Sequence, residues 1–210
     1  CVTTSEHQKE FLSNLMRNVS YDVLEPFISD EFEPQVLPSK PIVAIHCRDQ
    51  RDSMNIIKSF YIKFPQYRWI TFRDMRGLTQ KEFATTLKDC FLSVWVDEIS
   101  SYGTFPLESM KVGIPVMGLV PNIVPTWMNE ENGIWINNKI QIVDYIADFL
   151  QNWLEDNVNE NLKEKMKETV SSLPTQYDFN KQAIELFEGY LKTRLTSFEE
   201  QLNKLETIEE

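Results

Sequence analysis

Short apolar runs alternate with segments of helical periodicity through the middle of the chain. Apolar positions at helical spacing predict helices over 54–64, 83–89 and 105–112, and a capping box at Thr79 to Glu82 precedes the second. Strands are expected at 42–45, 67–72 and 91–96, in a run that starts at Ile114, and at 133–136. Strands that alternate with helices in this way are typical of a parallel sheet covered by helices. The pattern therefore predicts an α/β fold.

The first 39 residues differ from this pattern. Val2 to Ser5 resembles the end of a strand, a helix is expected from Glu6 to Met16, and prolines interrupt the stretch from Glu25 to Pro41. We therefore divide the chain into the end of a preceding domain and a linker at 1–39, an α/β domain at 40–155, and carboxyl-terminal helices at 156–210. Because the opening residues enter an element in mid-course, we expect the chain to be a piece of a longer protein.

The carboxyl-terminal part is predicted to be helical, at 140–155, at 159–172 and from about Phe179 onward. Apolar residues recur every three or four positions along the last helix and form one stripe on an acidic rod. The stripe consists of Ile184, Phe187, Leu191, Leu195, Phe198, Leu202 and Leu205. We expect it to pack on this domain or on a further part of the protein. A homodimer formed through a coiled coil is the alternative.

The stretch from Ser100 to Val116 carries the most specific chemistry. It joins the carboxyl end of a predicted strand to the start of a helix, which is where parallel sheets bind ligands. Gly103 lets the backbone approach a ligand, and the first amides of the helix point at it with the positive end of the dipole. The Glu108 carboxylate, one turn further on, can accept hydrogen bonds from a diol such as a ribose. An ordinary connection with a surface glutamate is the alternative.

This stretch resembles the hallmark loop of the retaining GT-B glycosyltransferases, often written E-G-F-G-x-P-x-x-E-A-M and followed by G-x-P-V. The residues in step with it are Tyr102, Gly103, Pro106, Glu108, Met110, Gly113, Pro115 and Val116. Asn132 to Trp135 matches the strand entry that follows the loop in that family. The resemblance covers residues 1 to about 155. It implies a Rossmann-like domain, the carboxyl-terminal half of a GT-B fold, here with a carboxyl-terminal helical extension.

The resemblance also implies how a nucleotide-sugar donor would be bound. Two basic residues after the first strand of this domain hold the diphosphate in that family, Glu108 would bind the ribose, and the base would lie near 73–78. The implied donor-binding set is Arg48, Arg51, Ser101, Tyr102, Gly103, Thr104 and Glu108. Guanidinium groups suit bidentate contacts to phosphate. The alternative is that both arginines are solvated and paired with Asp49 and Asp52.

Two positions depart from the pattern of that family. Ser100 stands where the first glutamate of a Glu-x7-Glu pair is expected, so that position has no carboxylate and no catalytic residue is assigned. Glu98 would replace it only if the loop shifted register. The glycine pair expected near 121–126 is also absent. Both changes surround the sugar, so nucleotide recognition is the better supported part of the prediction.

The composition narrows the remaining function classes. A net charge of −11 argues against a general nucleic-acid-binding surface. Three cysteines without a CxxC pair, and two histidines, indicate neither a disulfide framework nor a zinc site. We expect no metal and no cofactor beyond the nucleotide-sugar co-substrate. The sequence has neither a bilayer-length apolar run nor a secretory signal. A cytoplasmic location is therefore expected, with peripheral membrane contact through a missing amino-terminal domain as the alternative.

Three functions fit these residues. The first is a glycosyltransferase of the hexosyltransferase type in carbohydrate biosynthesis, with this chain as its donor-binding domain. Such a fragment is expected to be inactive alone, because the amino-terminal acceptor domain is missing. The second is a degenerate, non-catalytic nucleotide-binding module, which Ser100 favours. The third is a domain like that of a sugar-nucleotide epimerase, against which the hallmark loop argues.

Overall fold

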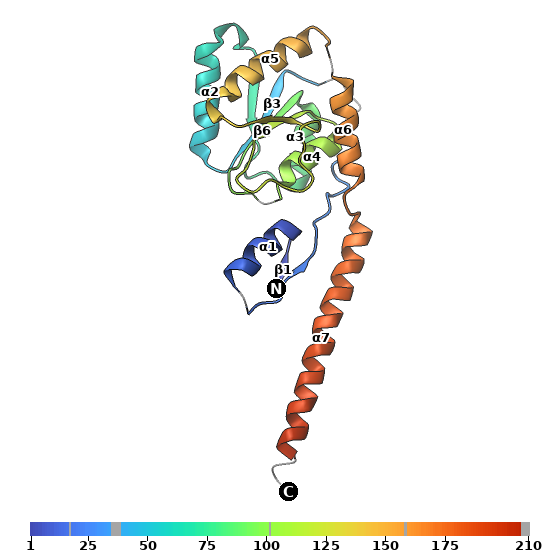
Figure 1. Ribbon diagram of the computed structural model, residues 1–210. Coiled ribbons are helices and arrows are strands. Elements are labelled where there is room, and N and C mark those ends of the chain that lie inside the picture. Colours follow the sequence, from blue (N-terminus) through green and yellow to red (C-terminus); the bar gives the residue numbers. More distant parts are fainter. Residues whose placement is uncertain (17, 35–38, 101, 158, 207–210) are drawn as a thin grey trace.

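A five-stranded parallel sheet forms the centre of the protein (Figure 1). The computed structural model describes residues 1–16, 18–34, 39–100, 102–157 and 159–206, the last six without their side chains. The strands are β3 (Ile42–Cys47), β4 (Thr71–Asp74), β5 (Leu92–Val96), β6 (Val116–Leu119) and β7 (Ile134–Ile136). They lie in the order β4-β3-β5-β6-β7, and each neighbouring pair is parallel. The predicted α/β class is confirmed.

Helices cover both faces of this sheet (Figure 1). The helices of one face are α2 (Gln50–Lys63) and α5 (Ile142–Leu154), and those of the other are α3 (Gln80–Asp89), α4 (Thr104–Val112) and α6 (Glu160–Ser171). Successive residues of a strand point to opposite faces. In β3, Val43 therefore shares a core with Phe60 of α2, and Ala44 shares the other core with Leu107 of α4.

Local hydrogen bonds set helix boundaries that apolar spacing alone places too late. The Asp49 carboxylate accepts the Arg51 backbone N–H at 2.9 Å, so α2 begins at Gln50, before its first apolar residue. Thr175 and Asp178 cap each other, so α7 (Gln176–Glu206) begins before Phe179. The strand expected at 67–72 is displaced, because a 3-10 turn at Pro65–Tyr67 precedes it and β4 begins only at Thr71.

A small unit at the amino terminus lies apart from the large sheet. β1 (Val2–Thr3) pairs in parallel with β2 (Asp22–Val23), and α1 (Glu6–Leu15) connects them. The Ser5 hydroxyl caps α1 by accepting the Gln8 N–H, which confirms the predicted strand that runs into a capped helix. Figure 1 shows this unit beside the long helix α7. The Tyr190 hydroxyl of α7 donates to Asp22 at 2.5 Å and joins the two.

The predicted apolar stripe of α7 faces outward over the part that the structure describes. Ile184, Phe187, Leu191, Leu195 and Phe198 are between 54% and 63% exposed. The side chains of Leu202 and Leu205 lie outside the described residues. The partner of the stripe stays a prediction. Among the helices described, none is both long enough and apolar enough to cross a membrane.

The capping box at the start of α3 provides a test of the local structure. The Thr79 hydroxyl accepts the Glu82 N–H, and the Glu82 carboxylate accepts the Thr79 N–H. We expect Thr79→Ala to lower the free energy of unfolding by about 1 kcal/mol, measured by urea denaturation. Thr85→Ala, inside α3 and also at an exposed position, is the control and should change it by less than about 0.5 kcal/mol. Equal effects of the two changes would contradict the capping role.

Candidate functional site

The order of the strands reverses at the carboxyl ends of β3 and β5. From β3 the chain moves to β4 on one side, and from β5 it continues through β6 and β7 on the other. In open parallel sheets a crevice forms outside the strand ends at this point, and ligands bind there. Arg48 follows β3 and Asp97 follows β5, and their side chains meet across this point with 3.6 Å between Nη1 and Oδ2. The topology therefore selects the same region as the sequence motif.

Helix α4 begins at this crevice. Gly103 precedes it in the left-handed region, with φ 72° and ψ 78°, and among the described residues no side chain caps the helix. The Thr104 and Phe105 N–H groups of its first turn have no acceptor within the helix and can bind an anion, whereas Pro106 has no N–H. Gly113 ends the helix with φ 89°, and its N–H donates to the Met110 carbonyl at 3.0 Å. The predicted short helix and its closing glycine are confirmed.

Two tryptophans fix the loop before α4. The Trp127 indole N–H donates to the Tyr102 carbonyl at 2.6 Å, and both residues are buried. A Cβ atom on Gly103 would lie 3.0 Å from the Trp95 ring and 3.4 Å from that of Trp127. The Tyr102 hydroxyl donates to the Pro26 carbonyl at 3.0 Å. Trp127 therefore supports the loop from the core side.

Glu108 lies on the second turn of α4, where it is partly buried. Its carboxylate has neither a hydrogen bond nor an ion pair with any residue that the structure describes. Burial raises the pKa of this carboxyl to about 7. A carboxylate that is partly desolvated and has no protein partner can accept hydrogen bonds from the hydroxyl groups of a ligand.

The two predicted arginines differ in their surroundings. The Arg51 guanidinium holds the Asp49 carboxylate, with 2.6 Å between Nη2 and Oδ2, and lowers the pKa of Asp49 to about 2. The Arg51 side chain is 85% exposed. The expected pairing of an arginine with Asp52 is not seen, because Asp52 binds Lys139. Arg48, at the strand ends, is the better placed of the two for a ligand in the crevice.

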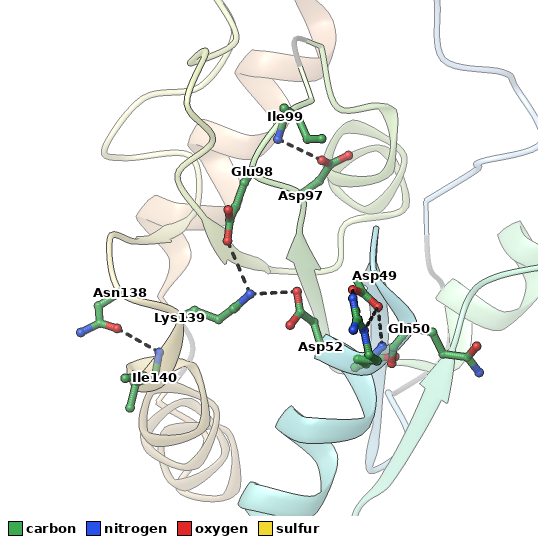
Figure 2. Close-up of polar contacts among 11 residues, drawn as sticks. Asp49, Gln50, Asp52, Asp97, Glu98, Ile99, Asn138, Lys139 and Ile140 are labelled. Atoms are coloured by element: carbon green, nitrogen blue, oxygen red, sulfur yellow. Dashed lines mark hydrogen bonds and ion pairs between the residues drawn. The ribbon is translucent and has the colours of Figure 1, made fainter.

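Lys139 was not predicted from the sequence, and it joins three segments of this edge (Figure 2). Its ammonium lies 2.9 Å from the Asp52 carboxylate in the first turn of α2 and 3.5 Å from the Glu98 carboxylate after β5. Asn138 caps the turn that carries Lys139 by accepting the Ile140 N–H at 3.0 Å. Lys139 comes three residues after β7, so its position behind a parallel strand was the available signal.

His46 and Arg76 also lie at this edge. The His46 ring stacks on Phe105 of α4 with 5.2 Å between centroids, and its buried Nδ1 has no hydrogen-bond partner among the described residues. Burial lowers the pKa of His46, against the opposing charges of Asp74 and Asp97. Arg76 pairs with Asp74 immediately after β4. His46 therefore sits between the arginine-bearing loop and the start of α4.

The positions that depart from the family's pattern lie in the loop after β5. Ser100 is partly exposed, and Ser101 lies outside the described residues. The Glu98 side chain is held towards Lys139, and its backbone carbonyl accepts the Asn122 N–H at 2.9 Å. Within the described residues, no group of three or more His, Cys, Asp or Glu side chains is arranged to hold a metal ion.

Comparisons with known proteins give relatives for the fold. No family model matches the chain. The alpha-1,6-glucosyltransferase of Actinobacillus pleuropneumoniae serotype 7 (strain AP76) is 24% identical over 119 residues, which are 56% of this chain and 36% of that protein.

Two solved structures resemble the chain over most of its length. The pneumococcal O-GlcNAc transferase GtfA, in complex with UDP and GlcNAc, matches 89% of this chain and 44% of its own, with a TM-score of 0.63 and 12% identity. Anabaena Alr3699/HepE, in complex with UDP, matches 90% of this chain and 63% of its own, with a TM-score of 0.63 and 11% identity. The chain thus spans less than two thirds of the length of each relative named here.

Gly103 offers a test of the loop before α4. Gly103→Ala places a Cβ atom against the Trp95 ring in a backbone conformation with φ +72°, so we expect it to destabilise the fold by about 3 kcal/mol. Gly77→Ala is the matched control, because Gly77 has φ +74° and open space around its Cβ position. Gly77→Ala should lower the free energy of unfolding only by the backbone strain, about 1 kcal/mol. If thermal or urea unfolding gave equal losses, the tryptophan contact would be unimportant.

The raised pKa of Glu108 predicts a dependence of stability on pH. Below pH 4.5 the carboxyl is protonated in both states. Between pH 4.5 and about 7 it ionises in the unfolded chain before the folded one, so stability falls as pH rises. Relative to Glu108→Gln, the wild type should lose about 1 to 3 kcal/mol across this window. Urea unfolding of both proteins at pH 4.5, 6 and 8 measures this, and a constant difference would refute it.

Proposed function

We propose that this chain, which has the fold of the carboxyl-terminal half of a GT-B glycosyltransferase, is the donor-binding domain of such an enzyme. The enzyme would transfer a hexosyl group from a nucleotide-sugar to an acceptor. One observation carries the proposal: the uncapped start of α4, Arg48 and the unpartnered Glu108 all belong to the connections that follow the two strands at the switch point. A cation and free amides can bind the diphosphate of a nucleotide-sugar, and a carboxylate can accept hydrogen bonds from its ribose hydroxyls.

The roles follow from the chemistry of each group. Arg48 and the first amides of α4 hold the diphosphate, and Arg51 joins them when it leaves Asp49. Glu108 accepts the ribose hydroxyls, and the base lies over the loop at 73–78. The two solved relatives named above contain UDP, so uridine diphosphate is the first nucleotide to test.

The reaction needs the chain mainly to stabilise a leaving group. The bond between the anomeric carbon and the terminal phosphate oxygen breaks, a bond from the acceptor hydroxyl forms, and that hydroxyl loses its proton. Negative charge then grows on the diphosphate, where the arginine and the helix amides stabilise it without a bound metal. Ser100 supplies no carboxylate to the sugar.

The acceptor is proposed to bind to a further domain, because the relatives are longer than the part that matches. The unit formed by β1, α1 and β2 and the exposed stripe of α7 are the surfaces we expect to contact it. A homodimer through α7 is the alternative. A cytoplasmic location, with membrane contact made through that further domain, belongs to the same proposal.

A second function is a nucleotide-binding module that has lost transfer. Ser100 favours it, because the carboxylate that the family places beside the sugar is absent. An epimerase-like domain is the weaker option, since it does not explain the match to the hallmark loop. The full-length protein separates these functions: acceptor-dependent release of nucleotide from a donor supports the transferase.

Calorimetry with UDP, GDP and ADP tests the site directly. We expect one of these nucleotides to bind. Arg48→Ala should lower its affinity about tenfold or more through the lost phosphate contact, and Glu108→Ala should lower its affinity through the lost ribose contact. Arg68→Ala is the control for charge. Arg68 is exposed and precedes β4, so it lies at the amino-terminal ends of the strands, away from the crevice at their carboxyl ends. Binding that survives both site changes, or that Arg68→Ala weakens equally, would sink the assignment.

A further inference from the structure

The crevice carries more negative than positive charge before any ligand arrives. Its described ionic groups are the cations Arg48, Arg51, Arg76 and Lys139 and the carboxylates Asp49, Asp52, Asp74, Asp97, Glu98 and Glu108. Each arginine has one carboxylate, whereas Lys139 has two. The whole chain has a net charge of −11. A diphosphate, itself negative, must therefore bind in a site where carboxylates outnumber cations.

Lys139 is the residue on which this balance depends. Asp52 lies in the first turn of α2, directly after the Arg48 connection, and Glu98 lies next to Asp97, the partner of Arg48. Lys139 reaches both carboxylates from the loop after β7, as Figure 2 shows. Asp52 on the α2 side and Glu98 on the β5 side would both repel a phosphate bound beside Arg48, and this one ammonium holds both of them.

The same acidic and basic groups act in opposite directions on Cys47, at the end of β3. Burial raises the pKa of the Cys47 thiol to about 12, the charges of Asp52 and Asp74 add to the rise, and those of Arg76 and Lys139 oppose it. Lys139 therefore already offsets Asp52 at the strand end that Arg48 follows. The Lys139 side chain is 39% exposed, so its removal would leave two partly hydrated carboxylates in place and would not open a cavity in the core.

We propose that Lys139 is a positioning residue that neutralises Asp52 and Glu98 and so allows the crevice to accept the diphosphate of a donor. The inference rests on the proposed function and adds a residue to it. Lys139 acts through the two carboxylates and makes no contact with phosphate. Its effect is therefore electrostatic: it depends on the charge of the ligand and on salt, and it disappears when the carboxylates are removed.

The experiment uses the 210-residue chain and whichever of UDP, GDP and ADP the wild type binds, with the matching nucleoside as an uncharged probe. At low salt, Lys139→Ala should lower the affinity for the diphosphate at least about fivefold and leave the affinity for the nucleoside unchanged. Calorimetry and ligand-observed NMR measure both affinities. The loss should shrink as salt rises to about 0.5 M. Adding Asp52→Asn and Glu98→Gln to Lys139→Ala should restore affinity to within about twofold of the wild type.

Lys63→Ala is the matched control, because Lys63 is likewise a lysine paired with a carboxylate, Asp144 of α5 at 2.5 Å, but at the far end of α2. It should leave both probes unchanged. The inference is overturned if Lys139→Ala weakens nucleoside and diphosphate alike, which indicates a structural tie, or if it weakens neither. It is also overturned if the triple variant stays weak, which indicates direct phosphate contact. A wild type that binds no diphosphate removes the proposed function itself.

Discussion

The contact between Gly103 and the two tryptophans is the constraint on which the crevice depends. Trp95 stands on the central strand β5, and Trp127 donates to the Tyr102 carbonyl from the loop beyond β6. A Cβ atom at position 103 would lie 3.0 Å from the Trp95 ring, so even alanine fits there only if the ring shifts. The backbone of Gly103 is also in the left-handed region just where α4 starts, which favours glycine for a second, independent reason. That turn leaves the first helix amides uncapped, and the sheet behind it places them at the switch point.

Much of this arrangement could be predicted from local sequence. The alternation of apolar runs gave the sheet, the Thr79 capping box gave one helix start, and the spacing from Tyr102 to Gly113 gave the loop and helix of the site. Each of these signals acts over a few residues, through side-chain period, capping or backbone conformation. The GT-B resemblance was confirmed as a statement about the fold. The roles of the individual site residues stay predictions.

The parts that could not be predicted depend on contacts between distant segments. Lys139 meets Asp52 across 87 positions of sequence, and nothing in the local pattern distinguishes it from a solvated lysine. The choice of Asp49 as the partner of Arg51 was one of two open pairings. Trp127 is buried behind the loop, which only the packing of the β6 side of the sheet reveals. Long-range pairing of charges is decided by topology, which periodicity does not encode.

The segment between the amino-terminal unit and the sheet is bonded to the helix that opens the crevice. Pro26 accepts the hydroxyl of Tyr102 at 3.0 Å, and Lys111 of α4 binds the Ile28 carbonyl and the Asp30 carboxylate, each at 2.8 Å. The segment 26–30 is thereby tied to both ends of α4, so any displacement of this segment would be transmitted to the helix.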